Sequence, residues 1–180
     1  MAEVIVTPAT RVHCSKMQAV DALKTLRGFI GSSQLQAIGD AMRGEEKQFF
    51  FDKMVSRADI VSTMPQTYQQ DGLGDQAIVS LHYFMGSMDW YITERDSDPD
   101  GEGQIQAFGL ADFGDGGELG YISIVELISA GVELDLYFTP QTLGAVKSKY
   151  EARVQAYEHK GMTRSDAQGV VEAEDMKAAS

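Results

Sequence analysis

Between residues 75 and 138, apolar and aromatic residues occur in short runs that turn residues separate. Runs rich in aromatic and β-branched residues and bounded by Gly, Asp and Pro favour antiparallel strands. In the run 77–84 both alternating faces are fairly apolar, which predicts a sheet covered by helices on at least one side. Trp90, Phe108 and Leu136 are expected to be largely buried. The predicted strands are residues 77–84, 89–95, 104–113, 118–122 and 132–138.

Before this stretch, apolar residues recur at helical spacing and predict three N-terminal helices. The third helix carries three consecutive phenylalanines at 49–51, which cannot all share one helical face. They are therefore core residues or, in part, a partner-binding aromatic patch. The predicted start residues of the three helices are Ser15, Ser32 or Ser33, and Glu45 with Glu46.

Two further helix starts are predicted after residue 122. Ser123 and Glu126 have the spacing of a capping box, which predicts a short helix to about Ala130. Thr139 followed by Pro140 predicts a capped helix that runs to about residue 160.

Together these elements predict an α+β fold, an antiparallel meander of about five strands flanked by N-terminal helices and one long C-terminal helix. We divide the chain into an N-terminal helical lobe at 1–44, an α+β domain at 45–161 and a flexible tail at 162–180. The tail is rich in Ala, Ser, Glu and Asp and lacks a core-forming stripe.

Composition narrows the class of protein further. The chain has 180 residues, 43% of them hydrophobic, but no apolar run long enough to span a membrane. The single cysteine, Cys14, provides neither an intramolecular disulfide nor a metal cluster. These features predict a cytoplasmic protein without a cofactor.

Charge is the most informative property of the sequence. The formal net charge is −12, and in residues 61–140 Arg95 is the one basic residue among 14 carboxylates. Such a segment repels phosphates, so we expect no direct binding of nucleic acid and instead a basic protein surface as partner. The residues predicted to bind it are Asp96, Asp98, Asp100, Glu102, Asp112 and Asp115.

Five sequence segments, LHYF, DWYITE, QAFG, ELGYIS..EL and ELDLYF, resemble a small family of unknown function over about residues 45–147. Members of that family occur in plasmids, integrative elements and phages, often near anti-restriction and conjugation genes. The resemblance implies an accessory protein of a mobile element that is directed at its host. It implies no particular chemical activity.

Three groups of residues are candidates for metal binding or catalysis. The segment from Asp96 to Glu102 has the D-x-D-x-D-G form of a calcium loop, but its twelfth position is Ala107 where a bidentate Glu is required. His82 and Glu94 lie on neighbouring predicted strands and form a diagonal acid/base candidate. A set of carboxylates for a metal-assisted hydrolase is also conceivable: Glu94, Asp112, Glu118 and Asp135.

The sequence contains no nucleophile elbow, Walker loop or H-E-x-x-H motif. We therefore expect a non-catalytic acidic binding protein of a phage or mobile element, which inhibits a host defence complex by presenting a nucleic-acid-like negative surface. Two alternatives stay open: a small carboxylate- or metal-dependent hydrolase, and a structural accessory of a larger element-encoded complex.

Overall fold

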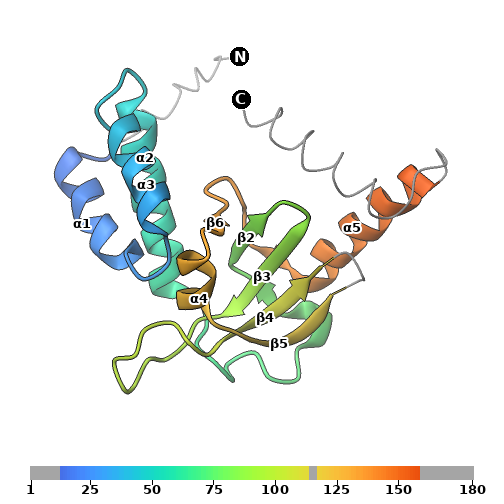
Figure 1. Cartoon of the computed structure of the whole chain (residues 1–180). Helices are drawn as coiled ribbons and strands as arrows, with labels where there is room; N and C mark the ends of the chain where they lie inside the picture. The colour runs from blue at the N-terminus through green and yellow to red at the C-terminus, as the bar shows by residue number, and fades with distance from the viewer. Residues whose placement is uncertain (1–12, 114–116, 159–180) are drawn as a thin grey trace, which may run out of the picture.

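The computed structural model describes residues 13–113 and 117–158, which form a mixed α+β structure (Figure 1). The predicted tail at 162–180 lies outside the described residues. The helices are α1 (Lys16–Leu26), α2 (Ser32–Ala41), α3 (Lys47–Thr63), the 3-10 turn η1 (Gly74–Gln76), α4 (Ile124–Ser129) and α5 (Leu143–Glu158). The strands are β1 (Ile78–Val79), β2 (Leu81–Met85), β3 (Met88–Glu94), β4 (Ala107–Asp112), β5 (Glu118–Ile122), β6 (Glu133–Leu134) and β7 (Gln141–Thr142).

A five-stranded antiparallel sheet with the order β5-β4-β3-β2-β6 forms the centre of the fold. The α+β prediction is thus confirmed, with one difference in topology. Strands β2 to β5 follow one another as a meander, but β6 returns past α4 to pair with β2 at the far edge. Strands β1 and β7 form a separate two-stranded ribbon.

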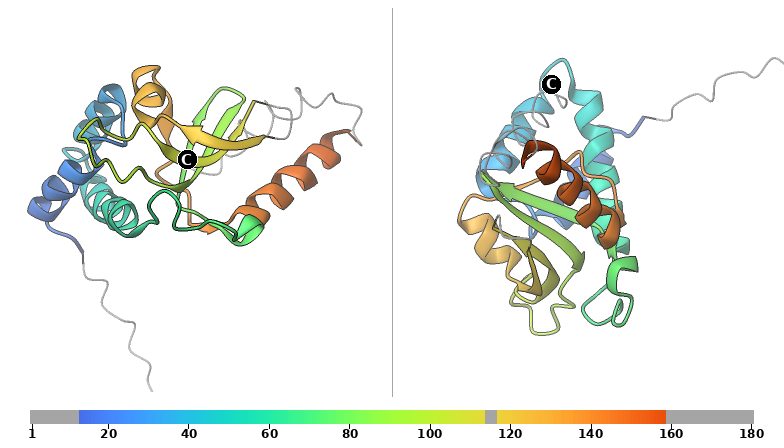
Figure 2. Two further views of the ribbon diagram at one scale, coloured as in Figure 1. Left: turned by 90° about the horizontal axis from the view of Figure 1, so that it is seen from below. Right: turned by 90° about the vertical axis from the view of Figure 1, so that its right-hand side faces the viewer.

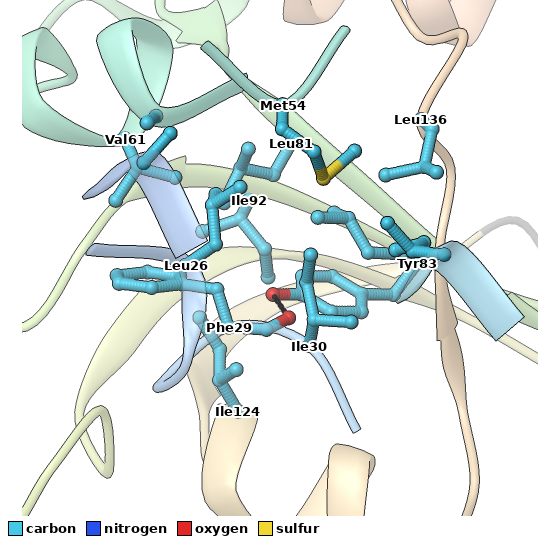
Figure 3. Packing of buried hydrophobic residues seen from close by; sticks show 14 of the residues in the cluster. Leu26, Phe29, Ile30, Met54, Val61, Leu81, Tyr83, Ile92, Ile124 and Leu136 are labelled. Carbon is cyan, nitrogen blue, oxygen red and sulfur yellow. Dashed lines mark hydrogen bonds between the residues drawn. The ribbon is translucent and has the colours of Figure 1, made fainter. Parts of the chain in front are cut away.

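Helices cover the sheet on both sides (Figure 2). Leu81, Tyr83 and Ile92 point to one side, where they share a core with α1, α2, α3 and α4. Figure 3 shows this packing, with the Tyr83 hydroxyl donating to the carbonyl of Phe29 at 2.7 Å. On the other side Val79 and Leu110 belong to a smaller cluster that includes Leu143 and Val146 of α5. Residues of the predicted N-terminal lobe and of the sheet therefore share one core, and the division at residue 44 stays a prediction.

Local sequence explains the helix starts in most cases. The side chains of Ser15 and Ser123 accept the amides of Gln18 and Glu126, as their capping motifs predict. The predicted cap of α2, Ser32 or Ser33, is wrong by one or two positions, because Gly31 is the N-cap and Ser32 is already helical. Glu46 precedes α3 as predicted.

Two predictions for the C-terminal third are wrong. Of residues 132–138 only Glu133–Leu134 is a strand, because the Asp135 carboxylate accepts the amides of Tyr137 and Phe138 and so turns the chain. Thr139 does not cap α5. Instead β7 intervenes, and the hydroxyl of Thr142 accepts the amide of Ala145.

The burial predictions hold for two of three residues. Trp90 and Leu136 are buried, at 7% and 8% exposure, whereas Phe108 is half-buried with its ring edge-on to Tyr121. None of the described helices has the length and apolar composition needed to cross a bilayer.

Candidate binding surface

The loop between β3 and β4 is folded around the carboxylate of Asp96. One oxygen accepts the amide of Asp98 at 3.0 Å, and the other accepts the amides of Ile105 and Gln106 at 3.2 and 2.9 Å. Burial raises the pKa of Asp96, but these backbone hydrogen bonds outweigh it and the pKa is lowered. Asp96 is therefore a charged side chain that holds the loop in shape.

The next carboxylates along the loop differ in exposure. Asp98 is half-buried, has a φ of 51°, and accepts the amide of Gly103 at 2.8 Å. Asp100 and Glu102 are exposed. The solvent-exposed carboxylates of this loop are therefore Asp100 and Glu102 at its tip. The carboxylates of Asp96 and Asp98 accept backbone amides within the loop and hold its shape.

A second loop, at residues 67–70, packs beside the first. The hydroxyl of Thr67 donates to the carbonyls of Arg95 and Gln106, at 3.1 and 3.0 Å. Glu94 is 3% exposed and accepts the amides of Tyr68 and Gln70. The strand register shifts between Ile92 and Glu94, so an irregularity in β3 immediately precedes this buried acceptor.

Tyr68 is held in an unusual conformation that exposes its ring. Its φ is 74°, which is a strained backbone for a residue with a side chain, and its side chain is among the most exposed aromatic groups at 65%. The hydroxyls of Tyr68 and Tyr121 are hydrogen-bonded at 2.7 Å. The hydrogen bond with Tyr68, burial and the nearby Asp71 and Glu94 carboxylates raise the pKa of Tyr121, so the Tyr121 phenol is neutral at physiological pH.

The two loops together border a shallow hollow of about 150 Å³, lined by both loops. This volume is below the range of ~300–1,000 Å³ typical of small-molecule pockets, so the hollow is smaller than a usual small-molecule site. We call the exposed residues around it the tyrosine–acid patch. Its members are Tyr68, Asp100, Glu102, Ile105 and Tyr121.

The six acidic residues predicted to bind a partner lie in different environments, and four of them line the hollow: Asp96, Asp98, Asp100 and Glu102. Asp96 and Asp112 are buried, at 9% and 3% exposure, and Asp112 lies opposite Asp89 within the sheet. Asp98 is half-buried, and Asp115 lies outside the described residues. Among the predicted residues that the structure describes, Asp100 and Glu102 remain for contact with a partner.

A buried ionic cluster lies at a different place in the sheet. The His82 ring has its Nε2 at 2.6 Å from a carboxylate oxygen of Asp89 and its Nδ1 at 3.2 Å from one of Asp135. The ring stacks on Tyr91 at 4.6 Å. Burial lowers the pKa of His82, but the hydrogen bonds and charges of Asp135 and Asp89 raise it to about 9.

This arrangement argues against a role of His82 as a general base. At neutral pH the imidazole is doubly protonated and donates to a carboxylate from each nitrogen, so it has no lone pair with which to accept a proton. The ring is therefore a structural cation between two strands and the turn after β6.

The structure does not bring His82 and Glu94 together as the acid/base candidate. A two-residue turn joins β2 and β3, so His82 pairs with Tyr91, while Glu94 binds the 67–70 loop. The four carboxylates that were candidates for a hydrolase do not share one site. Glu94 binds the 67–70 loop, and Asp135 binds His82. Within residues 13–113 and 117–158, no three His, Cys, Asp or Glu side chains gather closely enough to hold a metal ion.

Cys14 does not have the environment of a reactive thiolate. It is half-buried beside Asp52, whose carboxylate accepts the Cys14 amide at 2.6 Å. Burial and the hydrogen bond and charge of Asp52 raise the pKa of the Cys14 thiol, which keeps it protonated.

Sequence reasoning missed Tyr68, Tyr121 and Glu94 as parts of one site. They come from three segments, and their convergence depends on the irregularity in β3 and on the hydrogen bonds of the 67–70 loop. A carboxylate at the end of an apolar strand, as in the run DWYITE, was the one available signal that Glu94 is enclosed.

The fold and this surface define an α+β protein with a central antiparallel sheet and an acidic, tyrosine-bearing patch beside one edge strand. The family model described as "Protein of unknown function (DUF2958)" matches residues 54–154, and the chain belongs to this family. The predicted family resemblance is thereby confirmed, while the mobile-element context stays a prediction. Comparison with curated proteins and with solved structures finds no match.

Proposed function

We propose that this chain is a non-catalytic binding protein that attaches to a basic protein surface through the tyrosine–acid patch. The observation that carries the proposal is Tyr68, whose strained backbone is fixed by the buried Glu94 and whose ring stands 65% exposed next to acidic residues. Strained residues persist where the surrounding structure enforces them, and they concentrate at functional sites.

The chemistry of the patch matches a cationic partner. Tyrosine rings attract Lys and Arg by cation–π contact, and the nearby Asp100 and Glu102 carboxylates add ion pairs. Tyrosine is also enriched among the residues that dominate binding energy at protein interfaces. A lysine or arginine of the partner would fit the hollow between the loops, with its charge toward the carboxylates.

The specific form of the proposal is an accessory protein of a phage or mobile element that acts in the cytoplasm. Its partner would be a host defence complex whose nucleic-acid channel is basic, and the patch would occupy that channel in place of phosphates. The support is the charge of residues 61–140, where carboxylates outnumber cations by 14 to one.

The test compares two variants with the same change in net charge. Asp100→Lys with Glu102→Lys reverses the patch, and Glu45→Lys with Glu46→Lys reverses an exposed acidic pair just before α3. Each tagged protein, and the wild type, is incubated with a lysate of the host cell, and captured proteins are quantified by mass spectrometry.

We expect proteins that the wild type and the Glu45/Glu46 variant capture and that the Asp100/Glu102 variant loses. Their capture should weaken as salt rises and should be competed by added DNA if they present a nucleic-acid channel. Equal capture by all three proteins would contradict the proposal, and loss with both variants would show that only net charge matters.

A further inference from the structure

The two edges of the five-stranded sheet are treated differently. At the β6 edge the side-chain amide of Gln34 donates to the carbonyl of Leu134 at 2.7 Å and accepts its amide at 3.0 Å. Gln34 thus satisfies the outward backbone groups of this edge, as a neighbouring strand would. Unpaired strand edges invite further pairing, and natural proteins commonly cover or disrupt them.

The opposite edge, β5, has no comparable cover in the described part of the chain. It is the terminal strand of the sheet order, and it pairs with β4 without a register shift over five consecutive residue pairs. The strand, Glu118–Ile122, contains neither proline nor lysine, the residues that typically protect an edge. Figure 1 shows β5 along the rim of the sheet.

The side chains on β5 indicate what kind of strand would fit. Leu119 and Tyr121 are 48% and 56% exposed, and they stand opposite Leu110 and Phe108 on one face of the sheet. An added strand would extend these two rows with apolar residues at alternate positions.

The charge near β5 defines the remaining positions of an added strand. Glu118 lies at one end of β5. Near the other end the hydroxyl of Tyr121 is hydrogen-bonded to Tyr68, which lines the same hollow as Asp100 and Glu102. Carboxylates thus flank both ends of the open edge, and cationic residues of a partner complement them.

We propose that β5 is a docking strand onto which a basic, extended segment of the partner adds as a sixth strand of the sheet. Backbone hydrogen bonds to β5 supply affinity, apolar residues extend the rows of Leu119 and Tyr121, and Lys or Arg residues toward both ends of the segment face the carboxylates that flank β5. This inference rests on the proposed function, because it names the form in which the basic partner binds.

The test uses the full chain and a synthetic peptide of alternating lysine and valine as probe. Two further peptides carry N-methyl groups, one on every valine amide and the other on every lysine amide. Both keep the charge and side chains of the parent peptide, but each lacks the backbone donors along one edge. Affinities are measured by calorimetry at low salt, and amide hydrogen exchange of residues 118–122 is followed with each peptide.

Strand addition predicts that one N-methylated peptide binds at least about tenfold more weakly than the other, because an edge strand pairs along one side of the peptide only. It also predicts slower exchange of alternate amides in β5 with the peptide that binds. Equal affinities of the two methylated peptides, or unchanged exchange in β5, would overturn strand addition while leaving electrostatic binding at the patch intact.

Failure of the proposed function has a different signature. In that case the parent peptide would bind the Asp100→Lys, Glu102→Lys variant as tightly as the wild type. If the parent peptide does not bind the wild type at all, both the proposed function and strand addition are overturned.

Discussion

Asp89 and Asp135 form ion pairs with the cationic imidazole of His82 inside the fold, whereas Asp100 and Glu102 are exposed on the loop between β3 and β4. All four belong to the same acidic stretch of sequence. The first pair has side-chain exposures of 15% and 26%, and both carboxylates bind the single positive charge of His82. The second pair faces solvent beside two tyrosines.

The comparison shows that a count of acidic residues does not measure a binding surface. Glu94 and Asp96 also accept backbone amides within the fold, so several carboxylates of this stretch stabilise loops and strands. Those charges are engaged before any partner arrives. The field that a partner meets comes from the few carboxylates whose oxygens stay in water, and these determine encounter rate and salt dependence.

The largest expected effect comes from removing the cation between the two inner carboxylates. His82→Phe keeps an aromatic ring against Tyr91 but removes the positive charge that Asp89 and Asp135 both bind. We expect the free energy of unfolding to fall by about 2–4 kcal/mol in urea titrations.

The control is Lys147→Gln, which breaks the exposed pair with Asp75 on the surface of α5. Exposed ion pairs are worth about 0–1 kcal/mol, so this variant should stay close to the wild type. A similar loss in both variants would show that the His82 cluster has no special role.

The same cluster predicts a loss of stability at alkaline pH. The pKa of His82 is about 9 in the folded protein, and it is ~6.5 in an unfolded chain. Between these values the folded state keeps a proton that the unfolded chain has released, so raising the pH lowers the free energy of unfolding. The contribution is fully present below pH ~6.5 and is lost as the pH rises through about 9.

The size of this effect follows from the difference in pKa and is about 3 kcal/mol. Urea titrations of the wild type at intervals from pH 6 to 9.5 measure it. His82→Phe should lack this slope, since it has no group that titrates at this place. A wild-type curve as flat as that of the variant would show that His82 is not held as a cation.

Sequence reasoning reached the fold through signals that are local. Ser15 and Ser123 cap helices by contacts three residues away, and the run 118–122 forms β5 with the predicted bounds. The strand predicted over residues 132–138 is too long. Their alternating pattern suits a strand, but the side chain of Asp135 accepts two backbone amides and turns the chain.

The site was less predictable because its contacts are distant in sequence. Asp135 is 53 residues from His82, and Tyr121 is 53 residues from Tyr68. Solvent exposure was also not predictable from the sequence. Asp96 and Asp100 belong to the same D-x-D-x-D motif, yet in the folded loop Asp96 is buried and Asp100 is exposed.

The smallest expected effect separates those two residues directly. Asp96→Asn keeps the shape of the side chain but replaces one acceptor oxygen by an amide nitrogen, which cannot accept the amides that Asp96 now binds. We expect a loss of about 1–2 kcal/mol in the free energy of unfolding, because a buried backbone amide is left without its acceptor. Asp100→Asn makes the same chemical change on the same loop at an exposed position, and it should stay within about 0.5 kcal/mol of the wild type. Binding to a basic partner should show the reverse order, with Asp100→Asn weakening it more than its effect on stability explains. If both substitutions destabilise the protein equally, the division between inner and outer carboxylates does not hold for this loop.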